Sequence, residues 1–287
     1  MRLLRFGKKG QERPGVITEQ GRVLDVSACG YDYGEEFFCQ GGFSFLEDWL
    51  LRHESQCPVV NLNEHRLGPV VTRPSKVIAV GLNYRAHASE TGAKVPTAPK
   101  IFMKATTAIC GSGDDLLLPE GSEHTDYEVE LACVIGRVCR SISQEDALSA
   151  VAGLTICNDY SERDWQKNWC GQFVKGKSAD TFCPLGPYLV RATGFDFDSS
   201  RIWLKVNGEL RQESTLSQMV FPLDRLVAEI SRHMTLLPGD VISTGTPSGV
   251  GLGFEPPRFL RQGDWVEYGI DGIGETRQQV TCQKSHD

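Results

Sequence analysis

Short runs of apolar and β-branched residues, separated by Gly and Pro, dominate the chain from Lys76 onward, and this pattern predicts strands rather than long helices. We expect strands at residues 76–80, 101–104, 116–118, 127–135, 188–190, 201–206, 240–244 and 264–270. Apolar residues recur at helical spacing in fewer places: residues 83–91, 144–151 (with Ser143 as N-cap) and 223–233. The pattern predicts a β-rich α+β fold.

The first part of the chain has a less regular pattern of apolar and polar residues. Strand-like pieces at residues 3–6, 16–18 and 23–26 precede one predicted helix at 45–52, whose apolar residues share a face. Two prolines and a glycine within residues 67–74 then predict a linker. We therefore expect a small N-terminal domain over residues 1–70 and a larger domain over residues 71–287.

Composition and charge disfavour some classes of binding partner and favour one cellular compartment. The 287-residue chain carries a formal net charge of −7 and no extended Lys/Arg cluster, which disfavours nucleic acid and anionic membrane surfaces. We expect no membrane span, because no stretch of roughly 18 consecutive apolar residues occurs. The N-terminus does not resemble a signal peptide, and the ten cysteines form no C-x-x-C pair. Reduced thiols and a cytoplasmic location are the expectation.

Two glutamates two residues apart open the most apolar predicted strand. Glu128 and Glu130 share one face of a strand, and their charges repel unless a proton or a cation lies between them. Asp159 ends the next apolar run and offers a third carboxylate. Three such oxygen ligands suit Mg²⁺, or Mn²⁺. From spacing alone, a solvated strand edge explains the two glutamates equally well.

Four sequence blocks resemble those of a known protein family, and two of them contain the three acids described above. Residues 126–131 (DYEVEL), 158–164 (NDYSERD), 80–90 (VGLNYRAHASE) and 243–251 (STGTPSGVG) resemble the fumarylacetoacetate hydrolase family, in the family's order. Residues 102–106, 176–182 and 3–7 resemble the branch of 2,4-diketo-3-deoxy-L-rhamnonate or -fuconate hydrolases, often labelled ureidoglycolate lyase. The resemblance implies a catalytic domain of mixed β-sheets with a few helices, following a small N-terminal domain.

The resemblance also implies a reaction and its machinery. It implies Mg²⁺-dependent hydrolysis of a C–C bond in a 2,4-diketo acid, giving pyruvate and a hydroxy acid in sugar-acid catabolism, by a homodimer with a small anionic 2-oxo acid as its substrate. The metal ligands would be Glu128, Glu130 and Asp159. On a mobile lid, His87 and Glu90 would take a proton from water, since i and i+3 are neighbours on a helix.

Cationic and polar residues complete the implied site. Lys177 would act in catalysis by stabilising enolate charge. The implied substrate-binding residues are Lys104, Arg163, Gln166 and Thr246. Without the resemblance, His87 and Lys104 have simpler interpretations. His87 would be a surface histidine on a helix, and Lys104 can equally be a lysine that ends a strand.

Other functions stay open from the sequence. The family's fold also carries decarboxylases, isomerases and hydratases, and ureidoglycolate lyase activity is a further alternative. A metal-binding protein without catalysis is the non-enzymatic hypothesis. Residues 171–178 match the pattern G-x-x-x-x-G-K-[ST] of a P-loop NTPase. We interpret that match as coincidental, because no apolar strand precedes it and Pro184 follows it closely.

Overall fold

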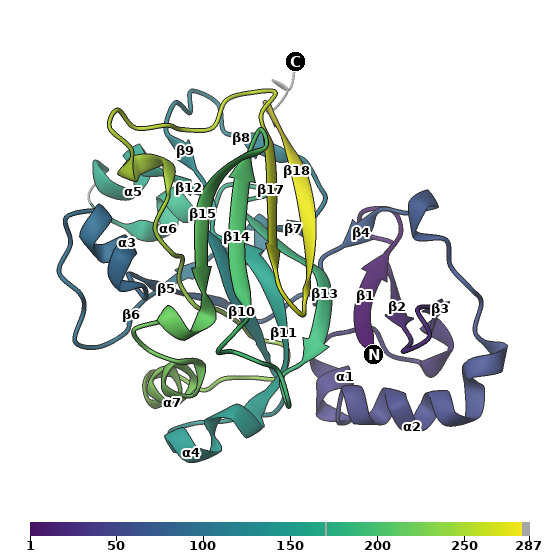
Figure 1. The fold of residues 1–287 in the computed structure, drawn as a ribbon. Coiled ribbons are helices and arrows are strands. Elements are labelled where there is room, and N and C mark those ends of the chain that lie inside the picture. The colour runs from purple at the N-terminus through teal and green to yellow at the C-terminus, as the bar shows by residue number, and fades with distance from the viewer. Residues whose placement is uncertain (170, 283–287) are drawn as a thin grey trace.

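A large mixed β-sheet forms the framework of the computed structural model, which describes residues 1–169 and 171–282. The strand order is β3-β2-β1-β13-β11-β10-β16-β5-β6, with β4 beside β1 and β7 beside β13 (Figure 1). The strands of this sheet are β1 (Arg2–Phe6), β2 (Arg13–Ile17), β3 (Val23–Asp25), β4 (Leu67–Gly68), β5 (Val77–Gly81), β6 (Lys100–Lys104), β7 (Ile109–Gly111), β10 (Val129–Ile135), β11 (Val151–Asn158), β13 (Cys183–Arg191) and β16 (Val241–Ser243).

A second, five-stranded sheet packs against the first. Its order is β15-β14-β17-β18-β8, and β14 and β17 contact β10 of the large sheet. Its strands are β8 (Leu116–Leu118), β14 (Arg201–Val206), β15 (Glu209–Thr215), β17 (Trp265–Ile270) and β18 (Gly274–Cys282). Every residue of β10 is buried, whereas buried and half-buried residues alternate along β14. The core therefore lies between the two sheets, with β10 at its centre.

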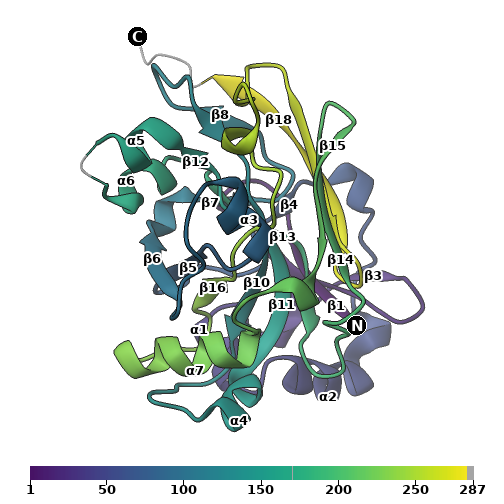
Figure 2. The same cartoon turned by 60° about the vertical axis from the view of Figure 1, so that its left-hand side comes forward.

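Helices lie at two ends of this framework (Figure 2). At one end, α4 (Gln144–Ala147) packs on α7 (Leu223–His233). At the other end lie α5 (Arg163–Lys167) and α6 (Phe173–Lys177), which contact each other, β6 and the two-stranded sheet of β9 (Thr125–Asp126) and β12 (Ser161–Glu162). Near them lies α3 (Arg85–Glu90). The second end carries the chemistry described below.

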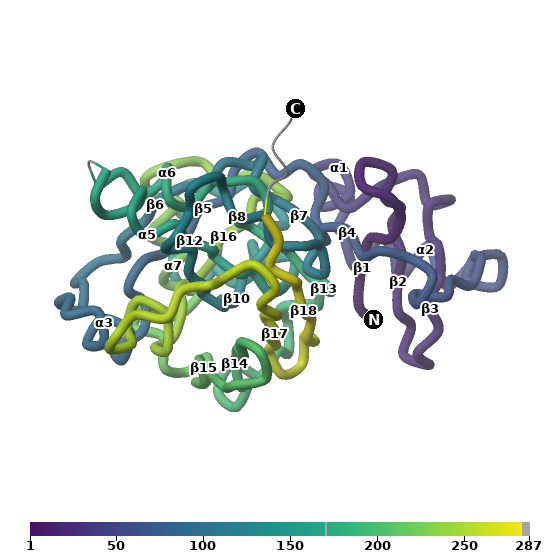
Figure 3. Tube along the Cα trace, turned by 90° about the horizontal axis from the view of Figure 1, so that it is seen from above, coloured from purple at the N-terminus to yellow at the C-terminus, as the bar shows by residue number. Residues whose placement is uncertain are grey.

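The N-terminal segment forms a lobe to one side of the main body (Figure 3). It contains α1 (Glu35–Cys39) and α2 (Phe43–His53), and its strand β1 pairs with β13, so β1, β2 and β3 extend the large sheet. Arg66 bridges the lobe and the main body, since its guanidinium donates to Glu12 at 2.7 Å and to Asp114 at 2.6 Å. The division of the chain at residue 70 stays a prediction.

The sheet-rich fold predicted from the sequence is confirmed, with differences at particular elements. Helix α7 covers the predicted residues 223–233, and the Ser143 hydroxyl caps α4 by accepting from the Asp146 N–H. The helix predicted at 83–91 begins only at Arg85, because the Asn83 amide is bonded to the Phe221 and Thr244 carbonyls. The helix predicted at 144–151 ends early, since residue 151 already starts β11.

Two further expectations concern cysteines and membranes. Nine cysteines fall in the described part of the chain, and all nine are unpaired thiols, as predicted. Cys170 lies outside the described residues. Within residues 1–169 and 171–282, no helix combines the length and the apolar character that crossing a membrane requires.

Candidate active site

The three predicted carboxylates converge at one end of the central strand pair. Glu128 precedes β10, Glu130 is its second residue, and Asp159 follows β11. The strands are antiparallel, with Val129 opposite Asn158, so the start of β10 lies beside the end of β11. One oxygen from each carboxylate lies within 4.8 Å of the others, and all three side chains are buried. The solvated-edge reading of the two glutamates is therefore wrong.

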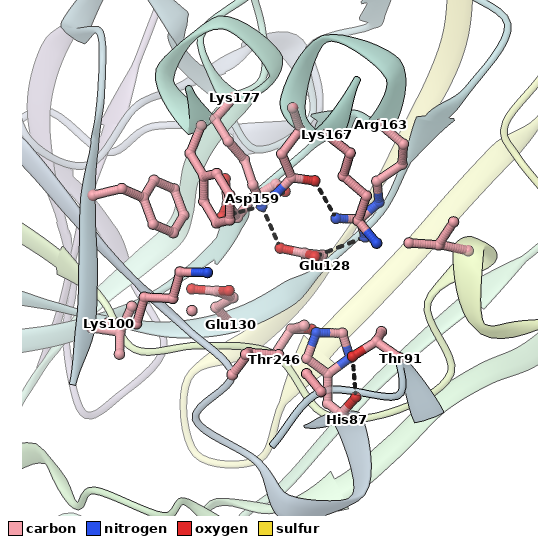
Figure 4. Close-up of a pocket in the computed structure, with 18 residues that line it drawn as sticks. His87, Thr91, Lys100, Glu128, Glu130, Asp159, Arg163, Lys167, Lys177 and Thr246 are labelled. Carbon is pink, nitrogen blue, oxygen red and sulfur yellow. Dashed lines mark hydrogen bonds and ion pairs between the residues drawn. The ribbon is translucent and has the colours of Figure 1, made fainter. Parts of the chain in front are cut away.

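Buried cations surround two of these carboxylates. The Lys177 ammonium donates to Glu128 Oε2 and to Asp159 Oδ2, each at 2.6 Å (Figure 4). Arg163 Nη2 donates to Glu128 Oε1 at 2.7 Å, and Lys104 Nζ donates to Asp159 Oδ1. Burial disfavours the charge on Glu128, but Lys177 and Arg163 outweigh it and lower the pKa of that carboxyl. Glu128 is thus held ionised, and Asp159 is hydrogen-bonded to two lysines.

Glu130 has a different environment. Its Oε2 accepts hydrogen bonds from the Ser243 hydroxyl at 2.6 Å and the Gly245 N–H at 2.9 Å, and no lysine or arginine among the described residues pairs with it. Burial, followed by repulsion from Asp159 and Glu128, raises the pKa of Glu130 well above its ordinary value. A divalent cation would remove this repulsion, and three carboxylates are a donor set suited to Mg²⁺ or Mn²⁺. The residues present fit such an ion.

Asp126 holds Arg163, the arginine of this cluster, in place. Its carboxylate accepts from Arg163 Nε at 2.8 Å, and also from the backbone N–H groups of Gly251 and Leu252 at 2.7 and 3.0 Å. The side chain is fully buried. Because Arg163 donates to both Asp126 and Glu128, the loop at residues 251–252 and the first carboxylate of the cluster share one rigid network.

A close approach of two short helices positions Lys177. Gly176 of α6 lies against α5 so closely that a Cβ at this position would lie 2.6 Å from the Gln166 N and the Glu162 O. Only glycine permits this contact without moving a helix. The contact places the Lys177 side chain, which is almost fully buried, between the carboxylates. Burial lowers the pKa of this lysine, but Asp159 and Glu128 outweigh burial and raise it.

The predicted lid dyad faces the same cavity. His87 and Glu90 lie three residues apart on α3, and His87 Nδ1 lies 3.4 Å from Glu90 Oε2. The other oxygen, Glu90 Oε1, accepts a hydrogen bond from the Gly249 N–H at 2.8 Å. Among the described residues, the Nε2 atom of His87 has no hydrogen-bond partner, so it can bind a water molecule.

A cavity of about 200 Å³ joins the lid to the carboxylates (Figure 4). Of the residues predicted from the sequence, it is lined by His87, Glu128, Glu130, Asp159, Arg163, Gln166, Lys177 and Thr246. Gln166 Oε1 accepts from Arg163 Nη1 at 3.0 Å, and the Thr246 hydroxyl donates to the Val129 carbonyl at 2.9 Å. Glu90 contacts the cavity only through His87, and Lys104 lies behind Asp159, outside the lining.

Sequence reasoning did not find several of the lining residues. Phe102 and Phe173 meet edge to face, with ring centroids 5.3 Å apart, and Lys100 and Lys167 also line the cavity. Strand alternation offers a signal for two of these residues, because Lys100 and Phe102 share a face of β6 with Lys104. Phe173 and Lys167 lie on five-residue helices whose sequences carry no periodic pattern.

The P-loop reading of residues 171–178 is wrong. A phosphate-binding loop connects a strand to a helix that begins at its lysine. Here helix α5 precedes the segment, and α6 begins at Phe173 and ends at Lys177. The lysine donates to two carboxylates, which leaves no anion site at this position.

Comparison with known proteins identifies the family to which the chain is similar. Residues 76–281 match the family described as fumarylacetoacetate (FAA) hydrolase C-terminal. A curated protein of Burkholderia ambifaria, named only "Putative hydrolase", is 45% identical over 282 residues, which cover 98% of this chain and 99% of that protein.

Two solved structures show the same fold over the whole chain. The fumarylacetoacetate hydrolase of psychrophilic Exiguobacterium antarcticum has a TM-score of 0.83 at 36% identity, covering 99% of this chain and 100% of that one. The maleylpyruvate hydrolase of Sphingobium sp. SYK-6, solved with manganese(II) and pyruvate, has a TM-score of 0.82 at 30% identity and the same coverage. The family resemblance seen in the sequence is confirmed: this chain belongs to the fumarylacetoacetate hydrolase family.

Proposed function

We propose that the protein hydrolyses a carbon–carbon bond in a 2,4-diketo acid, with Mg²⁺ or Mn²⁺ bound by Glu128, Glu130 and Asp159. One observation carries this proposal: the carboxylate cluster and the lid dyad face each other across a single cavity. A divalent ion at the cluster would supply a Lewis acid that polarises a chelating 2-oxo acid. The relative from Sphingobium, which holds manganese(II) together with pyruvate, supports this ligand chemistry.

The residues of the chain account for the proton and charge transfers. His87, oriented by Glu90, accepts a proton from water at Nε2. The resulting hydroxide adds to the C4 carbonyl, and the C3–C4 bond then breaks. Its electron pair passes to the pyruvate fragment as an enolate, whose charge the Lys177 ammonium stabilises. Protonation at C3 yields pyruvate. The acyl part leaves as a carboxylic acid that contains the oxygen of the attacking water.

The same site could serve other reactions of 2-oxo acids, and the dyad favours hydrolysis. Isomerisation or decarboxylation needs no added water, whereas His87 presents a free Nε2 to the cavity and is backed by a carboxylate. The identity of the substrate as 2,4-diketo-3-deoxy-L-rhamnonate, with its sugar-acid pathway, stays a prediction from the resemblance. The homodimer and the cytoplasmic location also stay predictions.

Acetylpyruvate tests the proposal directly. We expect the protein to release pyruvate from acetylpyruvate with Mg²⁺ or Mn²⁺, and to stop when a chelator is added. Glu128→Ala should abolish this release, while Glu120→Ala, a change at an exposed acid, should not affect it. Pyruvate release that ignores the chelator, or that survives Glu128→Ala, would overturn the assignment.

A further inference from the structure

We propose that His124, Glu162 and Asp164 form a second metal site, outside the cavity, and that this site takes Zn²⁺. His124 immediately precedes β9, Glu162 ends β12, and Asp164 is the second residue of α5. Strands β9 and β12 pair with Thr125 opposite Glu162, which brings the three side chains together beside this small sheet (Figure 1). One nitrogen or oxygen atom from each side chain lies within 4.8 Å of the others, and none of the three residues lines the cavity.

Glu162 is a buried acid without a cationic partner. The residue is only 1% exposed, and within residues 1–169 and 171–282 no lysine or arginine forms an ion pair with it. Its Oε2 accepts hydrogen bonds from the Ser122 and Thr125 hydroxyls, whereas its Oε1 has no donor among the same residues. A buried carboxylate is unfavourable unless it is paired with a charge or bound to a metal. This lone acid indicates a cation independently of the spacing of the three side chains.

The imidazole favours a different ion from the one proposed for the cavity. Zn²⁺ binds histidine nitrogen together with carboxylate oxygen, whereas Mg²⁺ and Mn²⁺ prefer oxygen ligands. His124 Nδ1 and Asp164 Oδ2 already face each other at 2.6 Å. Two donor atoms of a tetrahedral zinc site lie about 3.3 Å apart, so a small rotation of these two partly exposed side chains would admit the ion.

Neighbouring groups orient the proposed ligands and leave them accessible. Asn168 Nδ2 donates to Asp164 Oδ1 at 2.9 Å, and the Phe259 and His124 rings meet edge to face with centroids 4.7 Å apart. Such outer contacts fix the direction of metal ligands. The His124 and Asp164 side chains are 37% and 43% exposed, so zinc can enter from solvent and water can take the fourth position.

Bound zinc would join β9 to the start of α5. These elements are already linked through the backbone, since the Arg163 N–H donates to the His124 carbonyl at 3.1 Å. Because the unfolded chain has no preformed site, zinc binding stabilises the folded state by mass action. At a free zinc concentration about a hundredfold above the dissociation constant, we expect the unfolding temperature to rise by about 4 °C.

Zinc titration of the full chain in a Glu130→Gln background, which weakens the first site, tests the proposal. Calorimetry should still detect one equivalent of Zn²⁺, and anomalous scattering at the zinc edge should place it between His124, Glu162 and Asp164. Adding His124→Gln or Asp164→Asn should lower the zinc affinity by at least about a hundredfold and remove the zinc-induced rise in unfolding temperature. The control is His233→Gln, because that histidine faces a single carboxylate, and it should change neither quantity.

The opposite results overturn the site. Zinc that binds equally well to both ligand variants, as it would at the exposed thiols of Cys39 and Cys282, excludes the proposed ligands. Absence of zinc binding in Glu130→Gln, or anomalous scattering located elsewhere, does the same. Asp164→Asn replaces a partly exposed carboxylate by an amide of the same shape, and its unfolding temperature in chelator checks that the fold is intact.

This inference is independent of the proposed function, since the zinc measurements involve no substrate.

Discussion

Glu90 accepts a hydrogen bond from the Gly249 N–H at 2.8 Å, and this contact fastens the lid helix to the loop that follows β16. Because the other oxygen of the same carboxylate lies 3.4 Å from His87 Nδ1, the position of the histidine depends on the loop. Gly253 of that loop lies so close that a Cβ there would be 2.3 Å from Glu90 Cδ. A side chain at position 253 would therefore displace the Glu90 carboxylate, which contacts His87.

Gly253→Ala should displace the Glu90 carboxylate, and with it His87, without disturbing the carboxylate cluster. A misplacement of about 1 Å at a catalytic group lowers the rate by about a hundredfold, and we expect kcat on a diketo acid to fall by about that factor. Steady-state kinetics measure the change, and Mn²⁺ affinity should stay at the wild-type value. Gly113→Ala is the matched control, since the nearest atom to its added Cβ is 4.0 Å away. Wild-type kcat in Gly253→Ala would show that the lid contact has no catalytic role.

His87→Gln should remove the general base while keeping a polar side chain of similar length. We expect kcat to fall by about 10²- to 10⁴-fold, the usual contribution of a positioned base. Inhibition by pyruvate in the presence of Mg²⁺ should be unchanged, because the carboxylates and Lys177 are intact. His233→Gln, on the exposed face of α7, provides the control. If kcat in His87→Gln equalled that of the wild type, the dyad would not belong to the mechanism.

Glu130→Gln should weaken metal binding strongly without destabilising the fold. The amide removes a charged ligand, and we expect Mn²⁺ affinity, measured by calorimetry, to fall by at least about a hundredfold. In chelator, the unfolding temperature should equal or exceed that of the wild type, because the change removes repulsion from Glu128 and Asp159. Glu120→Gln should change neither quantity. Undiminished Mn²⁺ affinity would place the metal elsewhere.

Glu12 should make the N-terminal lobe sensitive to acid. Burial opposes ionisation of this carboxyl, but its hydrogen bond from Arg66 and the charge of Arg5 leave its pKa below the ordinary 4.5. A lowered folded-state pKa gives stability that is present above the unfolded value and is lost as pH falls through the folded value. In denaturant titrations between about pH 5 and about pH 3, the free energy of unfolding should therefore fall less in Glu12→Gln than in the wild type. Identical pH profiles would contradict this role, and Glu64→Gln, at an exposed acid, is the control.

Elements with a strong local signal were predictable from the sequence. Helix α7 and strand β10 have apolar residues at the period of their own structure, so burial of one face or of the whole strand is already encoded locally. Strand β15 was missed because it is a polar edge strand, with the sequence ELRQEST, and is defined by pairing with β14. The five-residue helices α5 and α6 were missed because they are held by packing on each other rather than by helix propensity.

Periodicity and short motifs were enough to predict the sheet-rich fold, the family and the three acids of the candidate metal site. How the cations contact those acids depends on the packing of elements that are distant along the chain. Lys177 contacts a carboxylate 49 residues away, Arg163 contacts one 35 residues away, and Lys100 and Lys167 share one cavity. Such contacts leave no local pattern, since they arise only when strands and helices distant along the chain pack side by side.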